Sequence, residues 1–301
     1  MKRLIIVAFL IVGTLTGAYG ARALWHRYRK PPERKAIIQP VGAIYNIVDN
    51  LYVVPSGGGN TAVFVTSKGV VLVDTKMTPS WQGLMQQIRT VTDKPIIYAI
   101  NTHCHGDHTG GNDFLPAGVE IVAQEETARE MKKMAYQFAD GDLRGLPTKT
   151  FTDKMTLLDG PDAVDLYYFG PAHTGGDAFV VFRAAGVMHV GDLFAYKSVP
   201  IINTERGGNG KTYAETLHKA VATIQGVDLV ITGHSTVMNW TDFEDYAEFN
   251  SALLEQAKAS MAAGEDEYHA VAALKLPDKF KDYDMATAIN AFDQIYKKFG
   301  K

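Results

Sequence analysis

The chain has 301 residues, 46% of them hydrophobic and 21% charged, which is typical of a globular protein with enough apolar side chains to bury a core. Its formal net charge of −3 lacks the strongly basic balance typical of a nucleic-acid-binding protein, so we expect no nucleic acid partner. A single cysteine, Cys104, excludes an intramolecular disulfide.

Residues 1–23 are predicted to be a signal peptide or a membrane anchor. Lys2 and Arg3 precede an apolar run over residues 4–21, which is the order of a secretory signal. The run is also close to the shortest stretch that spans a membrane, and basic residues that resist translocation follow it. A cleaved signal, an exported domain anchored through residues 4–21, and a cytosol-facing domain therefore remain alternatives. We expect a periplasmic or secreted protein whose only membrane contact is this segment.

The rest of the chain divides into three parts. Residues 24–35 form a basic linker with two prolines, too polar to pack into a core. A main domain is expected at residues 36–240, followed by a C-terminal helical extension over residues 241–301 that packs on it. A capping box at Thr241 and Glu244 predicts the start of the first helix of this extension.

Short apolar runs between turn residues predict the strands of the main domain. They are Ile44–Ile47, Leu51–Val54, Thr61–Thr66, Val70–Asp74, Pro95–Ile100, Val164–Phe169, Phe179–Phe182, Val187–Val190 and Asp228–Thr232. Helices are expected from Thr78, over residues 125–138 and over Thr212–Ile224. This order predicts an α/β fold in which two sheets pack together with helices outside. The glycine-rich Ser56–Asn60 is a predicted hairpin tip, either a plain turn or a flap over a site.

The segment Asn101–Gly111 carries the strongest chemical signal. It follows a predicted buried strand and places four potential metal ligands within six residues: His103, His105, Asp107 and His108. Because a strand end is rigid, ligands there can be held in a fixed geometry. Imidazoles with a carboxylate and no thiolate favour zinc, with iron or manganese as alternatives.

Three more potential ligands each follow a predicted strand. They are His173 after Val164–Phe169, Asp192 after Val187–Val190 and His234 after Asp228–Thr232. Since sites in α/β sheets form at the carboxyl ends of strands, we expect these residues to meet the Asn101–Gly111 segment.

The combination resembles the metallo-β-lactamase superfamily over roughly residues 36–240. The resemblance rests on five motifs in order: Val73-Asp74-Thr75, the histidine cluster, His173, Asp192 and His234. It implies an αββα four-layer sandwich with a pair of metal ions at one edge. It also implies that the first metal is held by His103, His105 and His173, the second by Asp107, His108 and His234, with Asp192 bridging. Asp74 would orient a ligand histidine.

One departure bears on the substrate. The true β-lactamases most similar in ligand set carry serine or cysteine in the fourth motif, whereas Asp192 resembles the glyoxalase II, arylsulfatase and lactonase branches. This lowers the expectation of β-lactamase activity without excluding it. Asn60, Phe194 and Tyr196 are the residues we expect in a substrate pocket.

The predicted function is a dinuclear zinc-dependent hydrolase. A hydroxide that bridges two zinc ions would attack a small ester, thioester, lactone or lactam, and Asp107 would orient it. Two alternatives remain: an iron-dependent oxidoreductase of the same fold, similar to the persulfide dioxygenases, and a non-enzymatic metal-binding protein. The sequence identifies neither the substrate nor the oligomeric state.

Overall fold

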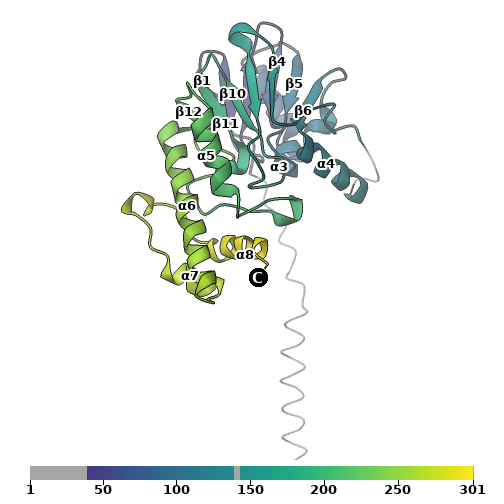
Figure 1. Cartoon of the computed structure of the whole chain (residues 1–301). Helices are drawn as coiled ribbons and strands as arrows, with labels where there is room; N and C mark the ends of the chain where they lie inside the picture. Colours follow the sequence, from purple (N-terminus) through teal and green to yellow (C-terminus); the bar gives the residue numbers. More distant parts are fainter. Residues whose placement is uncertain (1–38, 139–142, 301) are drawn as a thin grey trace, which may run out of the picture. The chain divides into compact units, whose positions relative to one another are not determined.

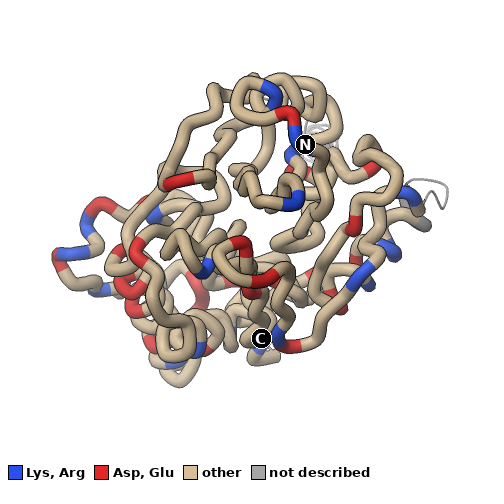
Figure 2. Tube along the Cα trace, turned by 90° about the horizontal axis from the view of Figure 1, so that it is seen from above, with Lys and Arg blue, Asp and Glu red and all other residues tan. Residues whose placement is uncertain are grey.

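The computed structural model describes residues 39–138 and 143–300. The predicted signal or anchor (1–23) and the basic linker (24–35) lie outside the described residues, so the periplasmic or secreted location stays a prediction. In the described part, no helix combines the length and the apolar character that a membrane span needs. Basic and acidic residues are intermingled along the chain in the view of Figure 2.

The strands form two mixed sheets. The first has the order β1-β2-β3-β4-β5-β6-β7, and its strands are β1 (Tyr45–Val48), β2 (Leu51–Val54), β3 (Thr61–Val65), β4 (Val70–Val73), β5 (Ile96–Ile100), β6 (Glu120–Gln124) and β7 (Lys149–Phe151). The second has the order β13-β12-β11-β10-β9-β8, and its strands are β8 (Lys154–Leu157), β9 (Val164–Tyr167), β10 (Phe179–Phe182), β11 (Val187–His189), β12 (Leu229–Ile231) and β13 (Met238–Asn239).

Helices cover the outer face of each sheet (Figure 1). The α-helices are α2 (Trp81–Arg89), α3 (Gly106–Thr109), α4 (Glu125–Phe138), α5 (Tyr213–Thr223), α6 (Trp240–Ala262), α7 (Glu267–Ala273) and α8 (Ala288–Lys298). Short 3-10 helices are η1 (Thr78–Ser80), η2 (Asn112–Phe114), η3 (Gly160–Asp162), η4 (Gly191–Phe194), η5 (Thr204–Arg206) and η6 (Asp278–Phe280). Helix α4 contacts β6 and β7 of the first sheet, whereas α6 contacts β12 and β13 of the second.

The alternation of side chains along each strand explains the layers. In β4, Val71 and Val73 join the core between the sheets, while Val70 and Leu72 face the layer of α2. Both faces are buried, so the strand is apolar throughout. The rings of Phe64 and Phe182, from different sheets, lie 5.2 Å apart and tie the central core together. The fold is therefore the predicted αββα sandwich.

The C-terminal helices share one apolar core with the second sheet. Residues from β10, β11, α5, α6 and α8 belong to the same buried cluster. The capping box at the start of α6 is a correction to the sequence prediction, because Asn239 and Asp242, not Thr241 and Glu244, exchange the capping hydrogen bonds. Strands β6, β7, β8 and β13 were not predicted.

The topology brings several strand ends to one edge of the sandwich. Strands β4, β5 and β6 are parallel, so the segments after β4 and β5 are neighbours. In the second sheet β11 is parallel to β12, and both β9 and β11 run antiparallel to β10. The carboxyl ends of β9, β11 and β12 therefore lie at one edge, where the predicted ligands follow them.

Candidate metal centre

Three imidazoles converge on one point after β5. His103 and His105 follow β5, and His173 lies in the connection from β9 to β10. Nδ1 of His105 lies 3.1 Å from Nε2 of His103 and 3.0 Å from Nε2 of His173. His103 and His173 are buried, and His105 is half-buried. One nitrogen of each ring thus faces a common centre, as the ligands of one metal ion do.

A second group of ligand atoms lies beside the first. Asp107 and His108 are on α3, and His234 follows β12. Nε2 of His234 lies 3.3 Å from Nε2 of His108 and 3.3 Å from Oδ2 of Asp107. His108 is fully buried, but the side chains of Asp107 and His234 are 32% and 30% exposed. A metal ion held here would be the more accessible of the two.

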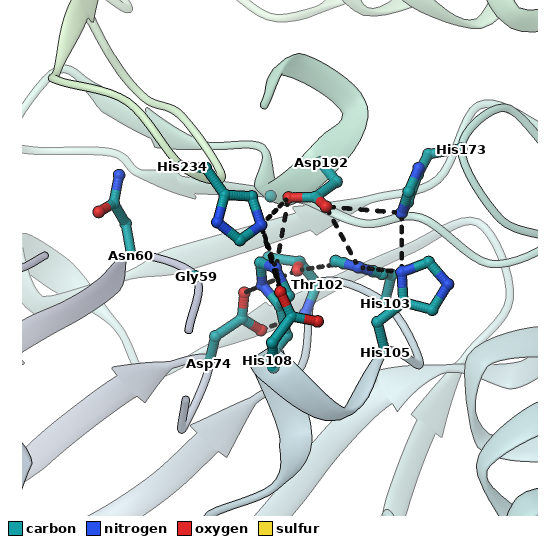
Figure 3. A network of polar contacts seen from close by, with 12 residues as sticks. Gly59, Asn60, Asp74, Thr102, His103, His105, His108, His173, Asp192 and His234 are labelled. Atoms are coloured by element: carbon teal, nitrogen blue, oxygen red, sulfur yellow. Dashed lines mark hydrogen bonds and ion pairs between the residues drawn. The ribbon is translucent and has the colours of Figure 1, made fainter. Parts of the chain in front are cut away.

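Asp192, on η4, faces both groups with its two carboxylate oxygens. Oδ2 lies 3.7 Å from Nε2 of His173 and 4.0 Å from Nε2 of His103. Oδ1 lies 3.2 Å from Nε2 of His234 and 3.3 Å from Nε2 of His108. Figure 3 shows the carboxylate between the two groups of rings. The structure thus brings together all seven predicted ligands, with the Asp192 carboxylate between the two groups.

These donors fit a pair of divalent metal ions. A tetrahedral zinc site with bonds of about 2.0–2.1 Å to nitrogen spaces its ligands about 3.3–3.4 Å apart. The ring nitrogens here are separated by 3.0–3.3 Å. Oδ1 of the buried Asp192 faces Nε2 of His108 and His234 at 3.3 and 3.2 Å but makes no well-aligned hydrogen bond with a described residue. Poor alignment is costly for a buried carboxylate oxygen. A bound cation would satisfy this oxygen.

Asp74, directly after β4, orients one ligand of each group. Its Oδ2 accepts hydrogen bonds from Nδ1 of His108 at 2.6 Å and from Oγ1 of Thr102 at 2.8 Å. The Thr102 hydroxyl in turn lies 3.0 Å from Nδ1 of His103. These contacts hold a ring proton on Nδ1 and direct Nε2 of both histidines toward the candidate metal positions. The structure therefore brings Asp74 to a ligand histidine, as the sequence predicted.

The other outer contacts were missed by the sequence analysis. Nδ1 of His173 donates to the carbonyl oxygen of Ile201 at 2.7 Å. Nδ2 of Asn203 lies 2.9 Å from Nε2 of His105. Both partners belong to a loop that begins after η4 and carries no motif, so no local signal could have identified them.

The two groups differ in charge when no metal is bound. Burial lowers the pKa of His103 well below its usual range and that of His105 to about 4. Burial also opposes protonation of His108 and His234, but the carboxylates beside them outweigh it. They raise the pKa of His108 well above its usual range and that of His234 to about 9. The pKa of Asp107 is lowered to about 2, against the effect of burial, by its contacts with His234 and His108.

Two of the three residues expected in a substrate pocket are buried and make contacts inside the protein. The side-chain amide of Asn60 is buried and donates to the carbonyl oxygens of Thr232 and Ser235. Phe194 is fully buried, with its ring 4.4 Å from that of Tyr246. Neither side chain is accessible to a substrate, which corrects the prediction. Tyr196 is half-buried, and its role stays a prediction.

The Ser56–Asn60 turn packs against the site and is not an open flap. A Cβ atom at Gly59 would lie 2.1 Å from Cε1 of His108, so only glycine fits there. Nζ of the buried Lys76 donates to the carbonyl oxygens of Val54 and Gly59, at 2.8 Å each. The turn is thereby held down on the His108 ring by a lysine that the sequence analysis did not single out.

Comparisons with known proteins agree with this geometry. The sequence profile described as the metallo-beta-lactamase superfamily matches residues 54–234. The alpha subunit of 2,4-dinitroanisole O-demethylase from Nocardioides sp. (strain JS1661) is 28% identical over 248 residues, which are 76% of this chain and 66% of that subunit. Metallo-beta-lactamase IND-1 from Chryseobacterium indologenes is 27% identical over 178 residues, which are 58% of this chain and 71% of that enzyme.

Among solved structures, the fold is similar to that of the stereoselective inverting sec-alkylsulfatase Pisa1 from Pseudomonas sp. The TM-score is 0.68 at 16% identity, and the match covers 86% of this chain and 50% of the alkylsulfatase. The chain therefore spans about half of that enzyme and slightly less than two thirds of the demethylase subunit. At this identity the similarity to the alkylsulfatase concerns the fold.

Proposed function

The chain belongs to the metallo-beta-lactamase superfamily, and on this basis we propose that it is a dinuclear zinc-dependent hydrolase of a small ester, thioester, lactone or lactam. The observation that carries the proposal is the position of Asp192, which presents one oxygen to each of two groups of ligand atoms. A single metal ion would need only one of these groups. The arrangement therefore favours a two-metal site over a site for one ion.

A pair of zinc ions bound there would lower the pKa of a bound water toward neutrality and polarise the group under attack. The chain's own residues would prepare the reaction. Asp107 is ionised at neutral pH, because its pKa is about 2, and its side chain is partly exposed. It can therefore accept a hydrogen bond from an attacking water and hold it in position. Substrate would enter on the side of Asp107 and His234, the most exposed carboxylate and imidazole of the set.

The names of the relatives suggest which substrates to test. We propose a panel of aryl esters, thioesters, lactones and nitrocefin, extended by a secondary alkyl sulfate and 2,4-dinitroanisole because of the relatives named above. The substrate class is decided by the pocket and not by the fold, so each compound is a separate hypothesis.

The test combines metal content with turnover. Purified protein is stripped of metal, reloaded with zinc and assayed on the panel, and we expect two zinc ions per chain and zinc-dependent hydrolysis. Asp192→Asn should abolish turnover and reduce the zinc content. Asp165→Asn, which removes the carboxylate paired with Arg183 at 2.7 Å, is the matched control and should keep both. Stoichiometric iron with oxygen consumption would overturn the proposal in favour of an oxidoreductase.

A further inference from the structure

The loop after η4 supplies outer contacts to two ligands of the first group. Nδ1 of His173 donates to the Ile201 carbonyl, and the backbone N–H of Asn203 donates to the carbonyl oxygen of His173 at 2.9 Å. The side-chain amide of Asn203 reaches His105. The first metal site is thus supported by a loop far from the histidine cluster in sequence.

The amide of Asn203 has two tasks and only one oxygen. Oδ1 accepts from the backbone N–H of Arg206 at 3.2 Å and so caps η5. Nδ2, which can only donate, faces Nε2 of His105 at 2.9 Å. In this orientation Nε2 of His105 has to act as an acceptor, so the ring proton resides on Nδ1.

Metal binding requires the opposite arrangement. Nδ1 is the nitrogen of His105 that faces His103 and His173, at 3.1 and 3.0 Å. If Nδ1 binds a metal, the ring proton moves to Nε2 and needs an acceptor, which ligand histidines in metal sites usually have. The amide nitrogen of Asn203 would then face an N–H group, with two donors opposed.

We propose that Asn203 is a positioning residue for the first metal and that its amide turns over when His105 binds the ion. The oxygen then accepts from Nε2 of His105, and the cap on η5 is given up. The proposal rests on metal binding at this site but not on the hydrolytic reaction.

The backbone around Asn203 is held in place, so a change of the protonated nitrogen on His105 is met by rotation of the Asn203 amide and not by a shift of the loop. Thr204 Oγ1 donates to Gln294 Oε1 on α8, and the N–H of Gly175 donates to the Arg206 carbonyl at 2.9 Å. A shift of the whole loop would break these contacts. Rotation of the amide gives up the hydrogen bond from Arg206 to Oδ1 and turns Nδ2 toward that N–H group. The Arg206 N–H keeps a second acceptor, the backbone carbonyl oxygen of Asn203 at 3.1 Å, so its hydrogen bonding is not lost.

Two substitutions separate the tasks. Asn203→Asp supplies two acceptor oxygens, one for Arg206 and one for His105, and should bind the first zinc at least as tightly as the wild type. Asn203→Ala supplies none and should weaken binding of the first zinc by about 10–100-fold. The readout is zinc affinity of metal-stripped protein, measured by competition with a chromophoric chelator.

Asn239 provides the matched control. Its side chain also caps a helix, by accepting from the N–H of Asp242 at 2.8 Å, but the helix is α6. Asn239→Ala and Asn239→Asp should leave the affinity for the first zinc unchanged. Loss of zinc affinity in these variants would mean that capping in general, and not the contact with His105, is being measured.

A spectroscopic measurement on the wild type completes the test. Nitrogen-15 chemical shifts of His105 in the zinc-loaded protein should show the metal on Nδ1 and the proton on Nε2. Metal on Nε2, wild-type affinity in Asn203→Ala, or equal losses in Asn203→Asp and Asn203→Ala would each overturn the proposal. Absence of turnover on every substrate would refute the proposed hydrolase but leave these readouts unaffected.

Discussion

Metal uptake should release protons at the second group of ligands and almost none at the first. In the metal-free protein, burial keeps His103 and His105 neutral at pH 7, because it lowers the pKa of His103 well below its usual range and that of His105 to about 4. His108 and His234 are cationic at this pH, since carboxylates raise the pKa of His108 well above its usual range and that of His234 to about 9. A metal binds only a neutral imidazole.

The size of the effect follows from His234. Removing a proton from a group with a pKa of about 9 at pH 7 costs about 2.7 kcal/mol, or about 100-fold in affinity. Each displaced proton makes the affinity rise about tenfold per pH unit below that pKa. His108 adds a second proton in the same direction. At pH 7 the first group should therefore fill before the second.

Calorimetric titration of metal-stripped protein with zinc measures both the affinity for each ion and the number of protons released. We expect an affinity for the first ion that changes little between pH 6 and 8, and an affinity for the second ion that rises steeply. Titrations in two buffers of different ionisation enthalpy count the released protons. His234→Ala lacks a ligand of the second group and should bind a single zinc ion at the first group. Binding of this ion should release almost no protons. Equal proton release by the two ions would refute the assignment of charge to the second group.

Three further substitutions test individual contacts. Thr102→Val removes the hydroxyl beside Nδ1 of His103 and should weaken zinc binding about 10–100-fold in the chelator assay, and an unchanged affinity would contradict its orienting role. Gly59→Ala should displace the ring of His108 and lose the second ion in metal analysis, whereas Gly106→Ala, with open space around its added Cβ, should retain it. Lys76→Met should change the pH dependence of stability measured by urea unfolding. Because burial lowers the pKa of Lys76 from 10.5 to about 7, the unfolded chain binds more protons than the folded protein between these pH values. The stability of the wild type should therefore rise by up to about 1.4 kcal/mol per pH unit relative to that of the variant. A constant difference from pH 7 to 9 would refute the lowered pKa of Lys76.

Much of the fold could be predicted because its signals are local. Strands such as Leu51–Val54 and Phe179–Phe182 are short apolar runs between turns, and the structure has both at the predicted bounds. Strand β6 (Glu120–Gln124) was missed because α4 follows it without any intervening turn residue. Strand β7 (Lys149–Phe151) has three residues and exists through its parallel pairing with β6, which no local pattern reveals.

In the candidate site, the ligands could be predicted but their surroundings could not. Each ligand follows a strand end or belongs to a dense motif, so its place is set by the topology. The direction of a neighbouring side chain depends on the path of the loop. Phe194 comes two residues after Asp192 in a 3-10 helix, where residues two apart point to different sides, and it packs into the core. Asn203 reaches His105 only through the course of a long loop.

Strained and buried residues beside the candidate metal centre hold its ligands in place before a metal binds. Asp74 and Lys76 both have a φ of 64°, a left-handed conformation that costs energy for residues with a Cβ atom. This backbone aims the Asp74 carboxylate at Thr102 and His108 and lets Lys76 reach the turn that covers His108. The surrounding hydrogen bonds fix the ligand geometry before any ion arrives. Because these ligands are already ordered, a metal ion that binds there loses little of its binding free energy to ordering them, which favours a high affinity for the ion.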